Sequence, residues 1–234
     1  MPRPKPARFY FSLRSPYSWL AYRDLHEHYP DLVGRLEWIP FWEPDKRTTD
    51  LLVEQDVELP YADMSRAKNL YILQDVGRIA KSRGIALSWP VDRDPVWEVP
   101  HLGYLVALAE GKGAEYVALV YRARWEQGRN ICERATIGEI GAELGLPGRI
   151  ADAADDEGLR ADGVRILRQV SDDGVFGVPF FTHGFTRFWG VDRLPDFAAH
   201  LRGARPPATA LPAPVPGVVG LGLSSDDGHA GGCG

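Results

Sequence analysis

Short apolar runs and amphipathic stretches follow one another along the chain, and their spacing predicts a mixed α/β protein. The aromatic run at residues 9–11 is typical of a short buried strand, and residues 36–41 form a second such run. Between them, a helix is expected from Pro16 to near Pro30, followed by a turn at residues 31–34. A strand, a helix and a strand in this order predict a βαβ unit with a parallel strand pair.

The middle of the chain is mainly helical in its pattern. Residues 43–60 lack periodicity and are expected to form a long loop or irregular turns. Beyond them, apolar residues recur three or four positions apart, as they do on the buried face of a helix. Thr136 and Glu139 have the spacing of a capping box. The predicted helices cover residues 64–83, 103–110, 114–126, 136–144 and 157–170.

The last part of the chain contains a predicted hairpin, a predicted helix and a tail of different composition. Residues 180–183 and 185–189 are expected to form a hairpin about Gly184, and residues 194–201 a closing helix. After residue 202 the sequence is rich in Pro and Gly and has too little apolar surface to fold, so a disordered tail is expected.

Composition limits the classes of function. The chain has 234 residues, of which 44% are apolar and 25% charged, with a net charge of −5, so neither nucleic acid nor an anionic membrane is an expected partner. No apolar run is long enough to span a bilayer and the N-terminus lacks the apolar core of a secretory signal, so a cytoplasmic location is expected. Cys132 and Cys233 are the two cysteines, and no Cys-x-x-Cys is present. A disulfide framework and a dithiol oxidoreductase are therefore disfavoured, and no metal site is predicted.

Ser15 and Pro16 mark the start of the first helix. Pro favours the first helical position, which makes Ser15 a natural N-cap. Its hydroxyl would lie beside the positive end of the helix dipole, where an anion is stabilised.

The segment Ser15-Pro16-Tyr17-Ser18 resembles the active-site segment of two related families, the 2-hydroxychromene-2-carboxylate isomerases and the kappa-class glutathione transferases. The resemblance implies a DsbA-like thioredoxin fold in which Ser15 replaces the first redox cysteine and holds the thiolate of bound glutathione. Nucleophilic catalysis by such a thiolate divides a difficult reaction into two easier steps.

Two further motifs carry the same resemblance. Val178-Pro179 matches the cis-proline segment, whose exposed backbone pairs with the peptide part of the thiol. Asp192-Arg193 resembles the segment that begins the last helix, where the Asp binds the γ-glutamyl ammonium group. The resemblance therefore implies that Val178, Pro179, Asp192 and Arg193 bind the cofactor, which is glutathione or another low-molecular-weight thiol.

The resemblance also implies a domain organisation. A large helical domain is inserted between the two halves of a thioredoxin-like fold, and residues 68–73 look like a helix of that insertion. The expected parts are a βαβ part at 1–44, the helical domain at 45–155, an αββα part at 156–202 and the tail at 203–234, which contains Cys233.

The sequence departs from both families around this core. Val191 replaces a polar residue, Ser12 stands where kappa enzymes carry an Asp, Arg14 is unusual beside the active-site Ser, and residues 58–61 lack the family's Asn. A different thiol or a different substrate is therefore an open alternative.

The function expected from these observations is a thiol-dependent isomerase for a conjugated, aromatic small molecule. Ser15 would activate the thiol, and Tyr17 and Trp42 would line the substrate site, although core packing explains each aromatic equally well. A glutathione transferase, a tailoring enzyme of secondary metabolism and a non-catalytic thioredoxin-like binding module are alternatives. A disulfide oxidoreductase would require Cys233 to reach Ser15. Kappa-like relatives are often dimers, so a homodimer is implied by the resemblance alone.

Overall fold

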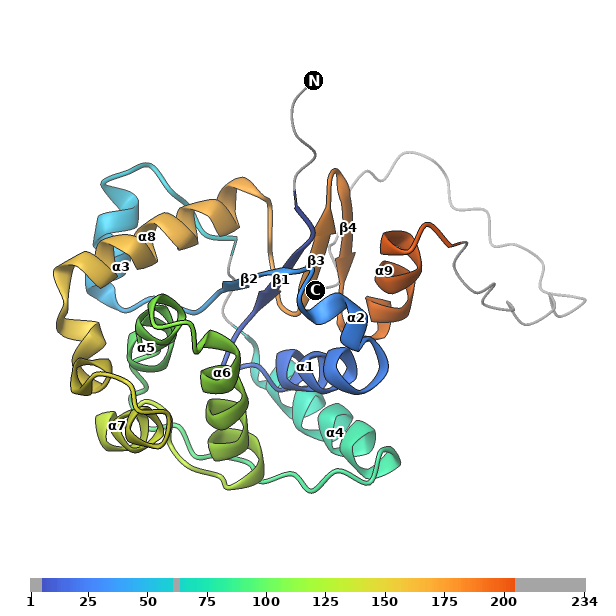
Figure 1. Cartoon of the computed structure of the whole chain (residues 1–234), viewed down its shortest axis with the longest axis horizontal. Helices are drawn as coiled ribbons and strands as arrows, with labels where there is room; N and C mark the ends of the chain where they lie inside the picture. The colour runs from blue at the N-terminus through green and yellow to red at the C-terminus, as the bar shows by residue number, and fades with distance from the viewer. Residues whose placement is uncertain (1–5, 61–63, 205–234) are drawn as a thin grey trace, which may run out of the picture.

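A four-stranded mixed sheet forms the centre of the protein (Figure 1). The structure is a computed structural model that describes residues 6–60 and 64–204. β1 pairs in parallel with β2 and antiparallel with β3, and β3 and β4 form an antiparallel hairpin, which confirms the predicted βαβ unit and hairpin. The strands, in the sheet order β2-β1-β3-β4, are β1 (Arg8–Phe11), β2 (Glu37–Pro40), β3 (Phe180–His183) and β4 (Thr186–Trp189).

Aromatic rings fill the space between one face of this sheet and two helices, α1 (Pro16–His28) and α9 (Leu194–Leu201). Phe9 stacks on Phe181 with ring centroids 4.9 Å apart, and Phe181 stacks on Phe197 of α9 at the same distance. Tyr22 of α1 meets the ring of Trp38 edge-on at 6.2 Å. The aromatic run that predicted β1 therefore supplies the centre of the core.

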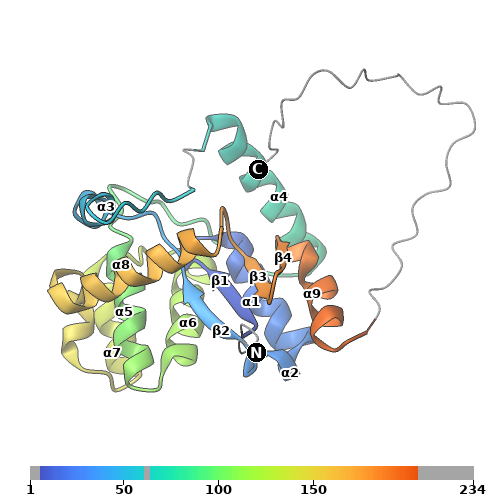
Figure 2. The same cartoon turned by 90° about the horizontal axis from the view of Figure 1, so that it is seen from above.

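Most of the helices lie between β2 and β3 in the sequence. Figures 1 and 2 show α5, α6 and α7 grouped on one side of the sheet, and α4 apart from them beside α1. After the short α2 (Pro30–Val33), the helices are α3 (Lys46–Val53), α4 (Arg66–Ser82), α5 (Glu98–Ala109), α6 (Gly113–Tyr121), α7 (Arg134–Glu143) and α8 (Glu157–Asp172). A π-helical turn continues α6 over Arg122–Glu126, and 3-10 helices cover Gly148–Asp155 and Val191–Arg193.

The prediction of a loop over residues 43–60 is wrong, because this segment contains α3. Asp45 caps the helix by accepting a hydrogen bond from the Thr48 N–H at 2.7 Å. Only Thr48 and Leu52 are buried on this short helix, which leaves little periodic signal in the sequence. Asp45 favours loops in general, but it also ranks among the best N-cap residues.

Three other local predictions differ from the structure. The expected capping box at Thr136 is absent, because α7 begins two residues earlier and Thr136 is buried within it. α5 begins at Glu98 instead of Gly103, since Pro100 fits in the first turn of a helix. The expected turn at residues 31–34 contains α2.

Two further predictions concern the C-terminal tail and membrane-spanning helices. Residues 205–234 of the expected tail, which include Cys233, lie outside the described residues. Over residues 6–60 and 64–204, no helix is both long enough and apolar enough to cross a membrane.

Candidate active site

Ser15 occupies the N-cap of α1, as predicted. Its backbone is extended, with φ −83° and ψ 123°, and its Oγ accepts a hydrogen bond from the Ser18 N–H at 3.2 Å. Pro16 begins the helix, and no acidic residue lies in its first turn. Among the described residues, the Ser15 hydroxyl donates no hydrogen bond. A half-buried hydroxyl with a free proton therefore stands at the positive end of a helix, which is a suitable environment for a thiolate.

The loop between β1 and α1 is held closed by its own backbone. The carbonyl of Ser12 accepts the Ser15 N–H at 3.1 Å, and the Ser12 N–H donates to the Ser18 Oγ at 3.2 Å. Ser12 is only 4% exposed. The direction of the Ser15 side chain consequently depends on where Ser12 is held.

The peptide bond between Val178 and Pro179 is cis, which confirms the prediction drawn from the resemblance. β1 and β3 are antiparallel, with Tyr10 opposite Phe180. This register brings Pro179 to the end of β1 from which the Ser15 loop departs. The structure thus places Ser15 and Val178-Pro179 at the same end of the sheet.

The backbone of Val178 is available for binding. The Gly190 N–H donates to the Pro179 carbonyl at 3.0 Å, so Pro179 directs its carbonyl toward β4. Val178 precedes β3 and lies next to the end of β1, because Tyr10 is opposite Phe180. No described residue pairs with the Val178 N–H or carbonyl. An extended ligand beside Val178 would find one donor and one acceptor there.

His101, which the sequence analysis did not identify, contacts the Ser15 loop from α5. Its side chain is 0% exposed, and its Nε2 accepts the Leu13 N–H at 3.1 Å. Since that nitrogen is an acceptor, Nδ1 carries the proton and donates it to the Trp97 carbonyl at 2.7 Å. Burial, together with the positive charges of the neighbouring Arg124 and Arg14, lowers the pKa of His101 to about 3. No local motif marks this residue, because its partners lie far away in the sequence.

A cluster of aromatic and charged side chains lies next to Arg14, the residue before Ser15. Arg14 forms an ion pair with Glu43, and its guanidinium lies 5.3 Å from the centre of the Trp97 ring. Arg124 lies 4.9 Å from the same ring and forms a bidentate pair with Asp92 at 2.8 and 2.9 Å. The Arg14 guanidinium beside Ser15 is therefore held by the Glu43 carboxylate and by the Trp97 ring, which Arg124 also contacts.

The two residues predicted to line the substrate site are placed differently. Tyr17 is half-buried, and its hydroxyl donates a hydrogen bond to Asp75 Oδ2 of α4 at 2.7 Å. Burial raises the pKa of Tyr17, and the hydrogen bond to Asp75 raises it further. Trp42 is 2% exposed and stacks on His101 with ring centroids 5.2 Å apart. Tyr17 thus stands at the edge of the site, whereas Trp42 lies behind the loop as packing.

Asp192 and Arg193 are exposed at the start of the last helical segment. Their side chains are 71% and 56% exposed, with 3.7 Å between the charged groups. Asp192 lines a cavity of about 470 Å³ with Arg23 and His28, which belong to the C-terminal half of α1. Arg23 lies about 12 Å along the helix axis from Ser15, from the rise per residue. A role of Asp192 in binding the thiol stays a prediction.

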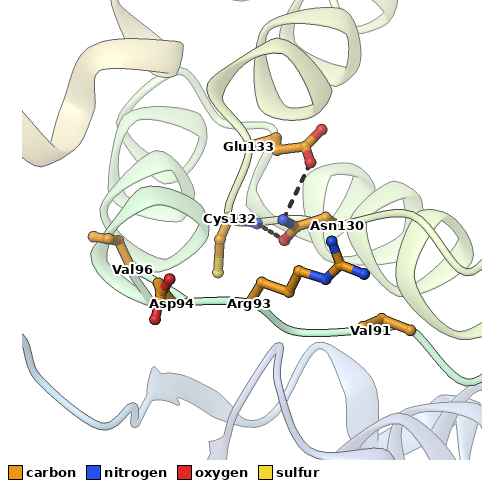
Figure 3. Close-up of a pocket in the computed structure, with 7 residues that line it drawn as sticks. All are labelled: Val91, Arg93, Asp94, Val96, Asn130, Cys132 and Glu133. Atoms are coloured by element: carbon orange, nitrogen blue, oxygen red, sulfur yellow. Dashed lines mark hydrogen bonds between the residues drawn. The ribbon is translucent and has the colours of Figure 1, made fainter.

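A second cavity, of about 550 Å³, lies beside the charged cluster (Figure 3). Cys132 points into it between Val96 and Asn130, and its backbone N–H donates to the Asn130 side chain at 3.0 Å. Burial raises the pKa of the Cys132 thiol to about 12. Cys132 is therefore protonated at neutral pH and is a poor nucleophile.

Comparisons with known proteins agree with this geometry. The sequence matches the DsbA-like thioredoxin domain over residues 8–202. A comparison with curated proteins finds no match.

Similar solved structures include enzymes with different activities. A 2-hydroxychromene-2-carboxylate isomerase aligns with a TM-score of 0.66 at 23% identity, over 84% of this chain and 94% of the other. A probable DsbA oxidoreductase from Streptomyces coelicolor aligns with a TM-score of 0.59 at 18% identity, over 93% and 98%. The cytosolic disulfide reductase DsbM from Pseudomonas aeruginosa, solved with GSH, aligns with a TM-score of 0.57 at 22% identity, over 84% and 97%. At these identities the likeness establishes the fold.

Proposed function

The chain belongs to the DsbA-like thioredoxin family, and we propose that it is a thiol-dependent isomerase of a small, conjugated, aromatic molecule. Glutathione or another low-molecular-weight thiol would be its cofactor. Two of the similar structures support this choice, since one is named as a 2-hydroxychromene-2-carboxylate isomerase and another was solved with GSH.

The proposal rests on the pairing of Ser15 with Val178. The Ser15 hydroxyl proton and the Val178 backbone, neither of which pairs with any residue of the described ranges, lie at the same end of the sheet. The loop from Ser12 to Ser18 contains no cysteine, so the loop itself supplies no thiol. Such a site fits an external thiol, with the sulfur at Ser15 and its peptide backbone at Val178.

Different residues of the chain would bind the thiol and activate it. When bound, the thiol would supply a sulfur that adds to a conjugated carbon of the substrate and later leaves it. Ser15 would donate its free proton to the sulfur while still accepting the Ser18 N–H, and the start of α1 would stabilise the negative charge. Asp192 would bind an ammonium group at the other end of the thiol, and Tyr17 would border the substrate.

Calorimetric titration tests the cofactor directly. The wild type and the Asp192→Ala variant would be titrated with glutathione, mycothiol and bacillithiol. We expect one thiol to bind at micromolar concentration, and the affinity to fall in the variant. If no thiol binds the wild type, the proposal is wrong.

Turnover of 2-hydroxychromene-2-carboxylate in the presence of the bound thiol tests the reaction. An isomerase returns the thiol unchanged, so the total thiol concentration should stay constant while the substrate spectrum changes. Stoichiometric loss of thiol would instead assign a transferase.

A further inference from the structure

His101 and the Ser15 loop are in direct contact although they lie far apart in the chain. The residue lies on α5, 88 positions after Leu13, whose N–H it accepts. Its Nε2 also lies 3.4 Å from the Ser12 Oγ. Both ring nitrogens therefore have partners, one in the loop and one in the turn at Trp97 that begins α5.

Tyr121 holds the same loop from α6. Its hydroxyl donates to the Ser12 carbonyl at 3.0 Å, and this carbonyl also accepts the Ser15 N–H. Tyr121 is 1% exposed. Two buried polar side chains from neighbouring helices thus fix Ser12 and Leu13, and through them the backbone of Ser15.

The imidazole of His101 pairs with a backbone group that an apolar side chain would leave unpaired. A buried neutral histidine is costly, because its polar atoms lose water, and an apolar side chain would pack on Trp42 without that cost. The imidazole supplies an acceptor for the Leu13 N–H, which would otherwise be buried without a partner. The ring, held at both nitrogens and stacked on Trp42, has a single orientation.

We propose that His101 is a positioning residue that, together with Tyr121, holds the β1–α1 loop so that the Ser15 hydroxyl is directed at the sulfur of the bound thiol. This role rests on the proposed function. His101 does not touch the sulfur in it and exchanges no proton; its effect passes through Leu13 and Ser12. Removal of its acceptor would let the loop relax and would weaken the bond from Ser15 to the sulfur.

The ionisation of bound glutathione tests this role, because thiolate absorbance near 240 nm reports it directly. His101→Phe retains a ring against Trp42. In this variant we expect the pKa of the bound thiol to rise by about one pH unit. At pH values below that pKa, the fraction of thiol present as thiolate should then fall about tenfold. His101→Gln retains an acceptor for the Leu13 N–H and should restore most of the shift. Tyr121→Phe should shift the pKa in the same direction.

Tyr116→Phe is the matched control. Tyr116 lies on α6, is 0% exposed, and donates to the Pro100 carbonyl of α5 at 2.9 Å, so the variant loses one buried hydrogen bond between the same helices. It should leave the pKa of the bound thiol unchanged. Amide hydrogen exchange provides a readout without ligand, in which the Leu13 and Ser15 amides should exchange faster in His101→Phe than in Tyr116→Phe.

The possible results separate the two proposals. If the wild type binds no thiol, the proposed function is wrong and this role falls with it. If His101→Phe binds glutathione with an unchanged thiol pKa, only the positioning role is wrong. If His101→Phe does not fold, Tyr121→Phe and His101→Gln decide the question, and an unchanged thiol pKa in Tyr121→Phe overturns the role.

Discussion

Ser15 of the β1–α1 loop and His101 of α5, which contacts that loop, have opposite relations to charge. Ser15 stands at the positive end of α1 with a free proton, so a neighbouring anion is stabilised. His101 is buried among apolar rings beside Arg14 and Arg124, so its own charged form is disfavoured. The site therefore favours negative charge at the start of α1 and keeps the His101 ring neutral.

Replacement of Ser15 by Ala should affect catalysis far more than stability. Ser65 is a matched control, because it caps α4 through the Lys68 N–H at 3.2 Å, as Ser15 caps α1. Both Ala variants should lose about 1 kcal/mol of unfolding free energy, measured by urea titration. Only Ser15→Ala should also lose turnover, by roughly 2–4 kcal/mol of transition-state stabilisation. Full turnover in Ser15→Ala would contradict the role of the hydroxyl.

Acid should destabilise the protein partly through His101. Its pKa is about 3 in the folded chain, below its value of about 6.5 in an unfolded chain. The unfolded state therefore binds the proton first, and stability is lost as the pH falls from about 6.5 toward 3, by up to about 1.4 kcal/mol per pH unit.

Comparison with His101→Phe isolates this contribution from that of Glu98, a buried carboxyl whose pKa is raised by burial. The stability advantage of the wild type over His101→Phe should shrink between pH 7 and pH 4 in urea titrations. An advantage that is independent of pH would show that His101 is not buried in its neutral form.

At the scale of elements, α3 depends on one half-buried ion pair, between Asp45 and Arg160, as much as on its own sequence. Asp45 caps α3 and also accepts two hydrogen bonds from Arg160 of α8, each at 3.0 Å. Arg160 is 6% exposed and donates in addition to Thr48 and to the Ala154 carbonyl. Burial raises the pKa of Asp45, but the bonds from Thr48 and Arg160 outweigh it and lower the pKa overall.

Asp45→Ala should therefore be strongly destabilising. It removes the cap and leaves Arg160 buried without its carboxylate, at a cost of about 3 kcal/mol or more in unfolding free energy. Asp45→Asn retains a good N-cap residue but loses the negative charge, so its smaller loss of unfolding free energy reports the contribution of the charged carboxylate. Asp31→Ala, which breaks the exposed pair with Arg202, should hardly change the urea midpoint. A cost for Asp45→Ala as small as for Asp31→Ala would contradict this account.

Elements with strong local signals could be predicted from the sequence, and elements held by distant contacts could not. The run at Phe9 to Phe11 and the Ser15-Pro16 cap predict β1 and the start of α1 without reference to the rest of the chain. α3 has two buried residues in eight, and its partner Arg160 lies 115 positions away. His101 is similarly defined by a partner 88 positions away. The cis bond at Pro179 followed only from the family resemblance.

For the molecule as a whole, the candidate site joins segments that are far apart in the chain. Ser15 follows β1, His101 and Tyr121 lie on α5 and α6, and Val178 precedes β3. A ligand that contacts both Ser15 and Val178 should therefore stabilise the whole fold.

Glutathione should raise the melting temperature of the wild type. At about one hundred times its dissociation constant, a ligand adds about 2.7 kcal/mol of stability, which corresponds to a rise of roughly 5–10 °C for a chain of this size. S-methylglutathione, which has no ionisable thiol, should give a smaller rise, because Ser15 has no thiolate to stabilise. Equal shifts with both compounds would show that the sulfur is not bound at Ser15.

The separation of Ser15 from Val178 has a consequence during synthesis. Ser15 leaves the ribosome more than 160 residues before the cis-proline segment. The hydroxyl therefore exists for several seconds or more without a site around it, at ordinary rates of elongation. If the proposed function holds, a nascent chain would activate a thiol only after β3 has emerged and the sheet has closed.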